Sequence, residues 1–236
     1  MIYMDNASTT VVDKEAFDIA KKYLLENYAN PSSSYSMAND VKADIQDARE
    51  MIASLIGARY NEIYFTSGGS EANNWAILKS CELMENKGKH IISSKIEHHS
   101  VLHVLSYLEK KGYEVTYLNT DEKGIIDINE LKSAIRKDTV LISIMFANNE
   151  IGTIQPVKEI GKLAHEYNIL FHTDAVQAVG HLPIDVKDLN IDLLSASGHK
   201  FHAPKGIGVL YKRDGVRLAR IITGGNQEGK RRPGTS

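Results

Sequence analysis

Short apolar runs alternate with longer amphipathic stretches along most of the chain. Each run is flanked by polar or glycine-containing sequence, as is typical of strands. The seven runs lie at residues 63–66, 90–93, 114–118, 140–145, 169–172, 193–196 and 207–211. Apolar residues recur at helical spacing in the stretches 38–56, 71–85, 101–111 and 157–167. This alternation predicts an α/β fold with a mostly parallel, seven-stranded sheet covered by helices.

Three regions depart from the alternation. The turn at residues 204–206 contains Pro and Gly, so we expect the last strand to form a hairpin with the strand before it. The first 30 or so residues predict a short arm followed by a helix, and residues 30–34 predict a loop. Residues 221–236 form a glycine-rich, basic segment in which we expect no helix or strand. Because compact domains rarely end in this way, we expect a truncated chain.

Composition excludes several classes of protein. The 236 residues are 42% hydrophobic and 25% charged, which fits one large globular domain or a domain and a fragment. With 28 basic and 30 acidic residues the formal net charge is -2, so we expect no binding to nucleic acid or to an anionic membrane. No apolar stretch approaches the ~20 residues that cross a bilayer, and the N-terminus lacks the regions of a signal peptide. We therefore expect a cytoplasmic protein.

The only cysteine, Cys81, excludes an intrachain disulfide and a multi-cysteine metal site, and we expect no metal cofactor. Cys81 lies in a stretch with helical spacing. A lone cysteine in such a position is usually a small buried hydrophobe with an unactivated thiol.

Lys200 and Asp174 suggest a site for pyridoxal phosphate. The chemistry of this cofactor needs a lysine amine that forms a Schiff base and an acid that keeps the pyridine nitrogen protonated. Each residue follows a short strand-like run. In a parallel sheet both side chains would emerge at the carboxyl edge, where ligands of open α/β sheets bind. Taken singly, Lys200 is better explained as a solvated loop residue and Asp174 as a turn or cap residue, and only the further matches below favour the cofactor site.

The sequence TSGGSEANN at residues 66–74 predicts a phosphate site. Its glycines and hydroxyls lie between a strand and a helix, so backbone N–H groups at the helix N-terminus can point at an anion. Gly69 permits close approach of the backbone, and the Ser70 hydroxyl can donate to a phosphate oxygen. Ser197 and His199 would supply a second wall. On its own, the motif is better explained as a helix cap formed by Ser67 or Ser70.

Eight blocks, taken in order, resemble the cysteine desulfurases of the NifS/IscS type, which are class V, fold-type I pyridoxal phosphate enzymes. The blocks are YMDNASTT (3–10), NPSS (30–33), TSGGSEANN (66–74), EHH (97–99), NNEIG (148–152), DAVQ (174–177), SASGHK (195–200) and RPGT (232–235). They extend over nearly the whole chain. The resemblance implies the large domain of that fold at residues 16–236, with residues 1–15 as an N-terminal arm that would join a small domain, itself largely missing.

The resemblance also implies a role for each matching residue. Lys200 is similar to the Schiff-base lysine, Asp174 to the pyridinium partner and His98 to the residue stacked on the ring. Asn149 and Gln177 are similar to donors near the ring hydroxyl. The implied phosphate binders are Gly69, Ser70, Ser197 and His199. Thr235 is similar to a threonine that reaches the phosphate site of the other subunit, which implies a homodimer with shared active sites.

The implied reaction converts L-cysteine to L-alanine and passes the sulfur, as a persulfide, to an enzyme cysteine and then to an acceptor or iron–sulfur scaffold protein. Lys200 and His98 would carry protons. The reactive cysteine of the family lies in a C-terminal region beyond these residues, and we do not expect Cys81 to replace it. Two alternatives stay open: another class V aminotransferase or lyase, and an inactive cofactor-binding dimerisation fragment.

Overall fold

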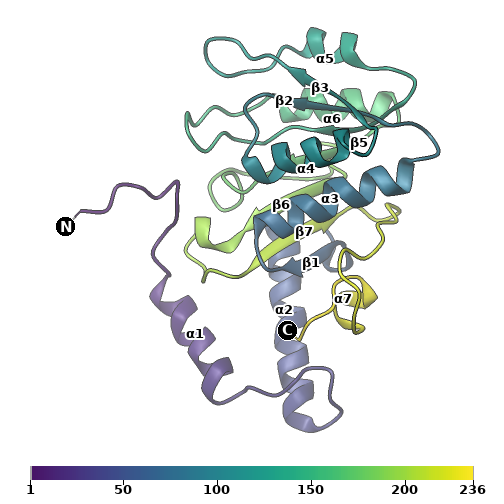
Figure 1. The fold of residues 1–236 in the computed structure, drawn as a ribbon. Coiled ribbons are helices and arrows are strands. Elements are labelled where there is room, and N and C mark those ends of the chain that lie inside the picture. Colours follow the sequence, from purple (N-terminus) through teal and green to yellow (C-terminus); the bar gives the residue numbers. More distant parts are fainter. Residues whose placement is uncertain (1, 236) are drawn as a thin grey trace.

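A computed structural model describes residues 2–235 as a seven-stranded sheet between layers of helices (Figure 1). The strands are β1 (Ile63–Thr66), β2 (His90–Ser94), β3 (Glu114–Leu118), β4 (Thr139–Ser143), β5 (Leu170–Asp174), β6 (Leu193–Ser197) and β7 (Gly208–Lys212). Their order in the sheet is β1-β7-β6-β5-β4-β2-β3. All seven predicted strands are present, and the prediction of a mostly parallel α/β sheet is confirmed.

Strand β7 is the exception to the parallel arrangement. It pairs antiparallel with β6, as the predicted hairpin requires, and also antiparallel with β1 at the edge of the sheet. Because β7 is antiparallel to both of its neighbours, β1 runs in the same direction as β6, β5, β4 and β2. The segments that follow these strands therefore meet at one edge of the sheet, including those after β1, β5 and β6.

Helices cover both faces of the sheet. Their bounds are α1 (Lys14–Leu25), α2 (Ser36–Leu55), α3 (Gly69–Met84), α4 (His99–Glu109), α5 (Ile128–Ala134), α6 (Val157–Glu166) and α7 (Gln227–Lys230), with 3-10 turns η1 (Tyr60–Glu62) and η2 (Gly198–Lys200). Helices α3 and α4 pack on one face around Ile77 and Leu105. Helix α6 packs on the other face, where Ile160 joins the largest core cluster with Phe171 of β5.

Helix α5 was not predicted from the sequence. It has only seven residues, too few for a clear helical period, and it begins where the Asp127 side chain accepts a hydrogen bond from the Asn129 N–H at 2.8 Å. Leu131 anchors it in the main core. A single cap and one buried side chain therefore specify this element.

The expectation of no helix or strand in residues 221–236 was wrong over a short span, since α7 lies there. Its backbone is irregular, with left-handed φ values of 46° at Glu228 and 60° at Gly229. Contacts with distant residues hold it: Arg49 donates two hydrogen bonds to the Glu228 carboxylate, each 2.7 Å long. In Figure 1 this segment, in yellow, lies beside α2 and β1. Tertiary contacts rather than local periodicity produce α7.

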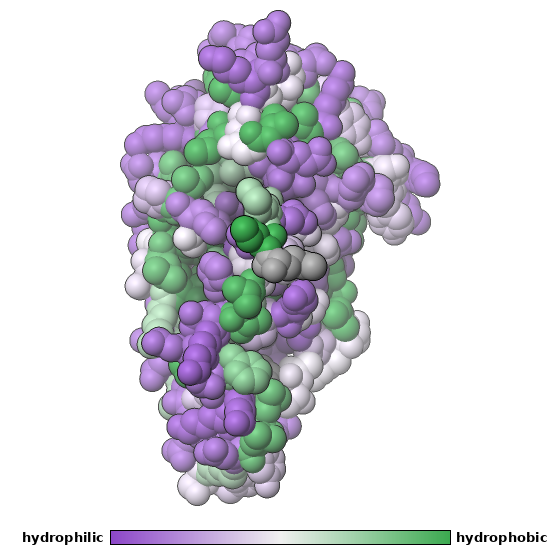
Figure 2. All heavy atoms as spheres, turned by 90° about the vertical axis from the view of Figure 1, so that its left-hand side faces the viewer, coloured by the Kyte–Doolittle hydropathy of each residue, from purple (hydrophilic) through white to green (hydrophobic). Residues whose placement is uncertain are grey.

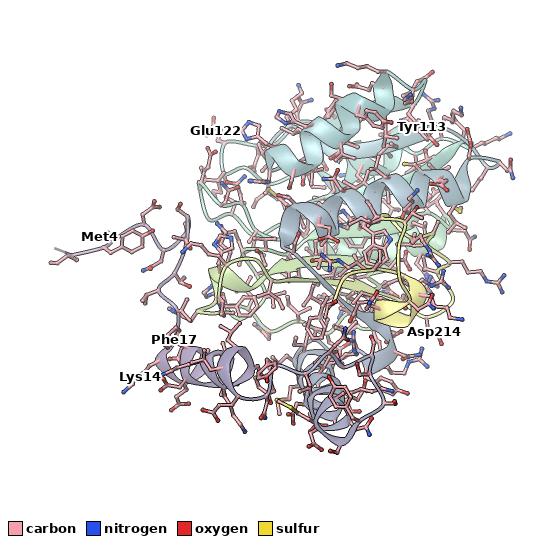
Figure 3. All side chains as sticks on the ribbon, turned by 60° about the horizontal axis from the view of Figure 1, so that its bottom comes forward. Met4, Lys14, Phe17, Tyr113, Glu122 and Asp214 are labelled. Atoms are coloured by element: carbon pink, nitrogen blue, oxygen red, sulfur yellow. The ribbon has the colours of Figure 1, made fainter. Side chains whose placement is uncertain are left out.

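The N-terminal arm leaves the body of the molecule and ends where α1 begins at Lys14 (Figure 1). Met4 points away from the body, and Phe17 lies on α1 (Figure 3). No residue of α1 is buried, and Phe17 is 55% exposed. On the side of the molecule that carries the arm, apolar patches are interspersed with polar ones (Figure 2). Among the described helices, none combines the length and the apolar character needed to cross a membrane.

Candidate active site

A cavity of about 550 Å³ opens where the segments following β1, β5 and β6 meet. It brings together nine of the ten residues that the sequence singled out. These are Gly69, Ser70, His98, Asn149, Asp174, Gln177, Ser197, His199 and Lys200. The tenth, Thr235, is exposed near the end of the chain and is not among the residues that line this cavity. The sheet therefore gathers side chains that are up to 131 residues apart in sequence, from Gly69 to Lys200.

Asp174 lies at the floor of the cavity, at the end of β5, and is only 5% exposed. Its Oδ1 accepts a hydrogen bond from the Val176 N–H at 3.0 Å, and its Oδ2 accepts one from the Asn73 amide at 2.7 Å. Burial raises the pKa of Asp174, while these donors and the nearby His98 and Lys200 partly offset the rise. A cationic N–H in the cavity would stabilise this carboxylate further.

A chain of hydrogen bonds connects Asp174 to His98. The Asn73 amide nitrogen donates both to Asp174 and to Ser100 Oγ, the latter at 2.8 Å, and Ser100 Oγ lies 2.8 Å from His98 Nδ1. His98 caps helix α4, and its Nδ1 accepts a bond from the Ser100 N–H at 3.1 Å. Because that backbone N–H can only donate, Nδ1 is unprotonated and neutral His98 carries its proton on Nε2.

Lys200 ends the 3-10 turn that follows β6 and points toward the N-terminal arm. Its Nζ donates to the Ala7 carbonyl at 2.6 Å and to the Ser8 carbonyl at 2.8 Å. Burial lowers the pKa of Lys200, although the charges of Asp174 and Asp5 work in the opposite direction. A lysine with a lowered pKa is a better nucleophile at neutral pH because more of it is the free amine.

Residues 67–70, here called the glycine turn, connect β1 to the N-terminus of α3. A side chain at Gly69 would lie 2.6 Å from Val176 Cγ2, so only glycine fits there. The turn also lies against β7, because a side chain on Gly208 would approach the Gly68 backbone to 2.6 Å. Ser197 is 4% exposed and packs against the same turn. A Cβ added to Gly69 would lie 3.4 Å from Ser197 Cβ. This packing leaves the first N–H groups of a 16-residue helix facing the cavity.

The remaining predicted residues lie on the walls of the cavity. Gln177 donates to the Ala7 carbonyl at 2.8 Å, and His199 Nδ1 lies 3.0 Å from Thr9 Oγ1, so both contact the N-terminal arm. Burial, followed by the charges of Lys200 and Lys205, lowers the pKa of His199. Asn149 is half-buried. The side chain before it, Asn148, accepts hydrogen bonds through Oδ1 from the N–H groups of Glu150 and Ile151.

Three residues of the site were missed from the sequence: Asn73, Ser100 and Glu97. Glu97 is 5% exposed and accepts hydrogen bonds from the Ser94 hydroxyl at 2.5 Å and the Met145 N–H at 3.0 Å. Its Oε2 is buried without a partner within the described part of the chain. Burial raises the pKa of Glu97 to about 8, and the charge of Asp174 contributes to this rise. Asn73 and Glu97 lie in two of the blocks that resemble the cysteine desulfurases, 66–74 and 97–99, but the resemblance assigned them no role.

Cys81 lies on α3 and is 0% exposed, as the sequence predicted. Burial raises the pKa of its thiol to about 12. A thiol in this state is neither accessible nor ionised at neutral pH, so Cys81 is not a nucleophile.

The residues of the cavity suit pyridoxal phosphate. A buried carboxylate with two N–H donors fixed behind it can face a protonated ring nitrogen, and Lys200 offers an amine nearby. The glycine turn supplies N–H groups and the Ser70 hydroxyl for a phosphate. The close contacts at Gly69 and Gly208 mean that these donors are held by packing before any ligand binds.

The sheet order and the edge site define an α/β protein of the fold-type I class. Residues 2–230 match the aminotransferase class-V family, and the chain belongs to that family. It is 58% identical over 234 residues to a cysteine desulfurase IscS of Methanosarcina thermophila and 53% identical over 234 residues to one of Dictyoglomus turgidum. These alignments cover 99% of this chain but only 58% and 59% of the two relatives. The resemblance to the cysteine desulfurases is confirmed.

Solved structures agree with this assignment. A NifS-like protein superposes with a TM-score of 0.97 at 40% identity, covering 100% of this chain and 65% of that one. SspA, solved in complex with cysteine, superposes with a TM-score of 0.97 at 44% identity, covering 100% of this chain and 69% of that one. The chain thus spans roughly three fifths of the curated relatives' length and about two thirds of these solved chains.

Proposed function

We propose that this chain carries the cofactor site of a pyridoxal-phosphate-dependent cysteine desulfurase. The observation that carries the proposal is the cavity in which Asp174, Lys200, His98 and the glycine turn converge. Identity of 58% to a cysteine desulfurase supports it. In domain terms, residues 16–236 would form the cofactor-binding domain and residues 1–15 an arm that also contacts the rest of a longer protein.

Each residue of the cavity has a part in holding the cofactor. Asp174 would hold the ring nitrogen, with Asn73 and Val176 fixing its carboxylate. His98 would contact the ring. The glycine turn would bind the phosphate together with Ser197 and His199, and Asn149 and Gln177 would hold the ring hydroxyl.

When bound, pyridoxal phosphate supplies an electron-accepting ring that weakens bonds at the α and β carbons of an amino acid. Lys200 would hold the cofactor through its amine, and as a free amine it would move protons at the α and β carbons of the substrate. His98 donates from Nε2, the nitrogen that its Ser100 contact leaves protonated. The arm carbonyls of Ala7 and Ser8 hold the released Lys200 ammonium within reach.

The proposed substrate is L-cysteine, and a related protein solved with cysteine supports this choice. In the overall reaction a thiolate attacks the substrate sulfur, so that L-cysteine and a thiol give L-alanine and a persulfide. Cys81 cannot supply that thiol, because it is buried with a pKa near 12. The sulfur therefore passes to a cysteine outside these 236 residues and then to an acceptor, for which an iron–sulfur scaffold protein is our proposal.

We also propose a homodimer in which Thr235 of one subunit reaches the phosphate of the other. The exposed position of Thr235, outside the cavity of its own chain, is compatible with this arrangement. Sedimentation equilibrium of the chain with and without pyridoxal phosphate tests it, and a monomer under both conditions would contradict it.

Absorption spectroscopy of the chain with pyridoxal phosphate tests the central proposal. We expect a visible band in the wild-type chain that is absent in Lys200→Ala, and a shift of that band when L-cysteine is added. Lys205→Ala is the matched control, because Lys205 lies in the same connection between β6 and β7 but not in the cavity.

Three outcomes would change the proposal. A band that does not depend on Lys200 would exclude it as the attachment site. Conversion of the cofactor to its amine form by other amino acids would indicate an aminotransferase. A folded dimer that gives no band at all would indicate a remnant without cofactor chemistry.

A further inference from the structure

Glu71 places a carboxylate directly beside the glycine turn. It lies in the first turn of α3, and its Oε2 accepts a hydrogen bond from the Ser67 N–H at 2.7 Å. The Glu71 side chain is 13% exposed. Glu71 is not among the residues that line the cavity, so it influences a ligand only through the turn.

A carboxylate in this position favours the helix but opposes the ligand. At a helix N-terminus it interacts well with the macrodipole and satisfies a backbone N–H. A phosphate bound to the same turn carries negative charge, however, and partial burial reduces the screening of the repulsion between the two. Unless the charge of Glu71 is compensated, it weakens phosphate binding.

Arg232 provides the compensation. Its Nε donates to Glu71 Oε1 at 2.9 Å and its Nη2 donates to Oε2 at 3.1 Å, a bidentate pair formed across 161 residues of sequence. Burial by itself raises the pKa of Glu71, but the bonds from Arg232 and Ser67 outweigh it and the pKa lies below its usual value. Glu71 is therefore ionised, and Arg232 balances it.

The surroundings of Arg232 fix it in place. On one side Glu228 is tied to Arg49 through side chains that are 4% and 13% exposed, and it also accepts from the Phe65 N–H at 2.9 Å. On the other side, Pro233 is buried against Gly224. A Cβ added to Gly224 would lie only 2.8 Å from Pro233 Cβ. The guanidinium is thus held by anchors before and after it in the chain.

We propose that Arg232 is a positioning residue for phosphate binding: by neutralising Glu71 it allows the glycine turn to accept an anion. This inference rests on the proposed function, because it assigns the turn to the cofactor phosphate. The inference predicts different effects on phosphate affinity for the two variants. Removing the charge of Arg232 leaves an uncompensated carboxylate beside the phosphate, whereas removing the charge of Glu71 leaves no carboxylate charge there.

The test is a titration of the 236-residue chain with pyridoxal phosphate and, separately, with pyridoxal, which lacks the phosphate. We expect Arg232→Gln to bind pyridoxal phosphate at least about tenfold more weakly, with pyridoxal unaffected. The double variant Glu71→Gln/Arg232→Gln is expected to bind about as tightly as wild type, and Glu71→Gln at least as tightly, because Glu71→Gln leaves the positive charge of Arg232 near the phosphate. Arg217→Gln, which removes the same charge from an exposed position, is the control.

Equal weakening by Arg232→Gln and Glu71→Gln, or equal weakening for both ligands, would identify a purely structural brace and overturn the inference. Unchanged binding in Arg232→Gln would do the same. If circular dichroism shows that Arg232→Gln does not fold, the double variant decides, since weak binding there contradicts charge compensation.

Inorganic phosphate binding, measured by calorimetry on the same variants, separates this inference from the proposed function. It needs no Lys200 chemistry, and the same order of affinities is expected. If the variants bind phosphate in this order but the wild-type chain gives no Lys200-dependent band, the proposed function alone is refuted. If the phosphate affinity is the same in all variants, the role of Arg232 is refuted.

Discussion

Asp174 and Glu97 are neighbouring buried carboxyl groups with different surroundings. Asp174 lines the cavity, and the hydrogen bonds that it accepts from the Val176 N–H and the Asn73 amide favour its ionised form. Glu97 lies outside the cavity lining, and one of its oxygens has no hydrogen-bond partner within the described residues. With a pKa of about 8, Glu97 is mainly protonated at neutral pH. A neutral Glu97 adds no second negative charge beside Asp174.

The raised pKa of Glu97 predicts how stability depends on pH. The folded state keeps the Glu97 proton up to about pH 8, whereas the unfolded chain loses it near pH 4.3, roughly the pKa of a free glutamate. Stability from this group therefore falls as pH rises through that window. Because Glu97→Gln cannot lose a proton, we expect its melting temperature relative to wild type to increase between pH 5 and pH 8.

Calorimetry at both pH values measures this difference. Glu122→Gln is the control, because Glu122 is exposed and projects from the surface (Figure 3). A constant difference for Glu97→Gln between pH 5 and pH 8 would contradict a protonated Glu97.

The sequence predicted the residues whose chemistry is distinctive and missed those that support them. Lys200, Asp174 and the glycine turn follow strands, so their meeting point could be deduced from topology. Asn73 acts through a bond to Asp174 that spans 101 residues, and neither composition nor periodicity indicates which helix face meets β5. Ser100 is recognisable only once His98 is known to cap α4.

At the scale of elements, α6 lies close to the segment before β6. This contact predicts that Gly161→Ala in α6 lowers the free energy of unfolding, whereas helix propensity alone predicts an increase. Gly161 has ordinary helical geometry, so alanine there should favour the helix by roughly 1 kcal/mol. A Cβ at this position would lie 2.0 Å from the Leu189 carbonyl oxygen, which is backbone and cannot turn aside. Overpacking at the upper end of its usual range, about 2–3 kcal/mol, therefore outweighs propensity, and we expect Gly161→Ala to lower the free energy of unfolding by about 1–2 kcal/mol.

Urea unfolding of the variant measures this loss. Lys162→Ala, at the exposed next position of α6, is the control and should be neutral within about 0.5 kcal/mol. A Gly161→Ala chain as stable as wild type would show that the 185–191 segment can move away from α6.

The elements with strong hydrophobic periods were predicted, and those defined by tertiary contact were not. Helices α2, α3, α4 and α6 lie within two residues of their predicted starts and ends. Helix α7 has no apolar period and is held by Arg49, which the sequence places 179 residues away. The antiparallel direction of β7 was predicted from its turn, but its place between β1 and β6 was not.

At the scale of the whole molecule, the N-terminal arm controls the environment of Lys200. Burial is the largest cause of its lowered pKa, and arm carbonyls lie within 2.8 Å of its Nζ. Asp5→Asn should therefore lower the Lys200 pKa, because the Asp5 charge raises that pKa in the intact chain.

The pH dependence of Lys200 modification by trinitrobenzenesulfonate, followed by peptide mass spectrometry, measures this shift. The midpoint is expected at lower pH for Asp5→Asn than for the wild-type chain. An unchanged midpoint in Asp5→Asn would contradict control by the arm.

The position of β1 at the sheet edge has a consequence for how the molecule folds during synthesis. Its neighbour in the sheet is β7, which follows it by about 140 residues, and Arg232 follows later still. Strands β2, β3, β4 and β5 can pair as they leave the ribosome, whereas β1 and the glycine turn must wait unpaired until β7 has been synthesised. The proposed phosphate site is thus encoded early and completed after most of the sheet, so a nascent chain that ends at β5 would not yet hold the glycine turn in place.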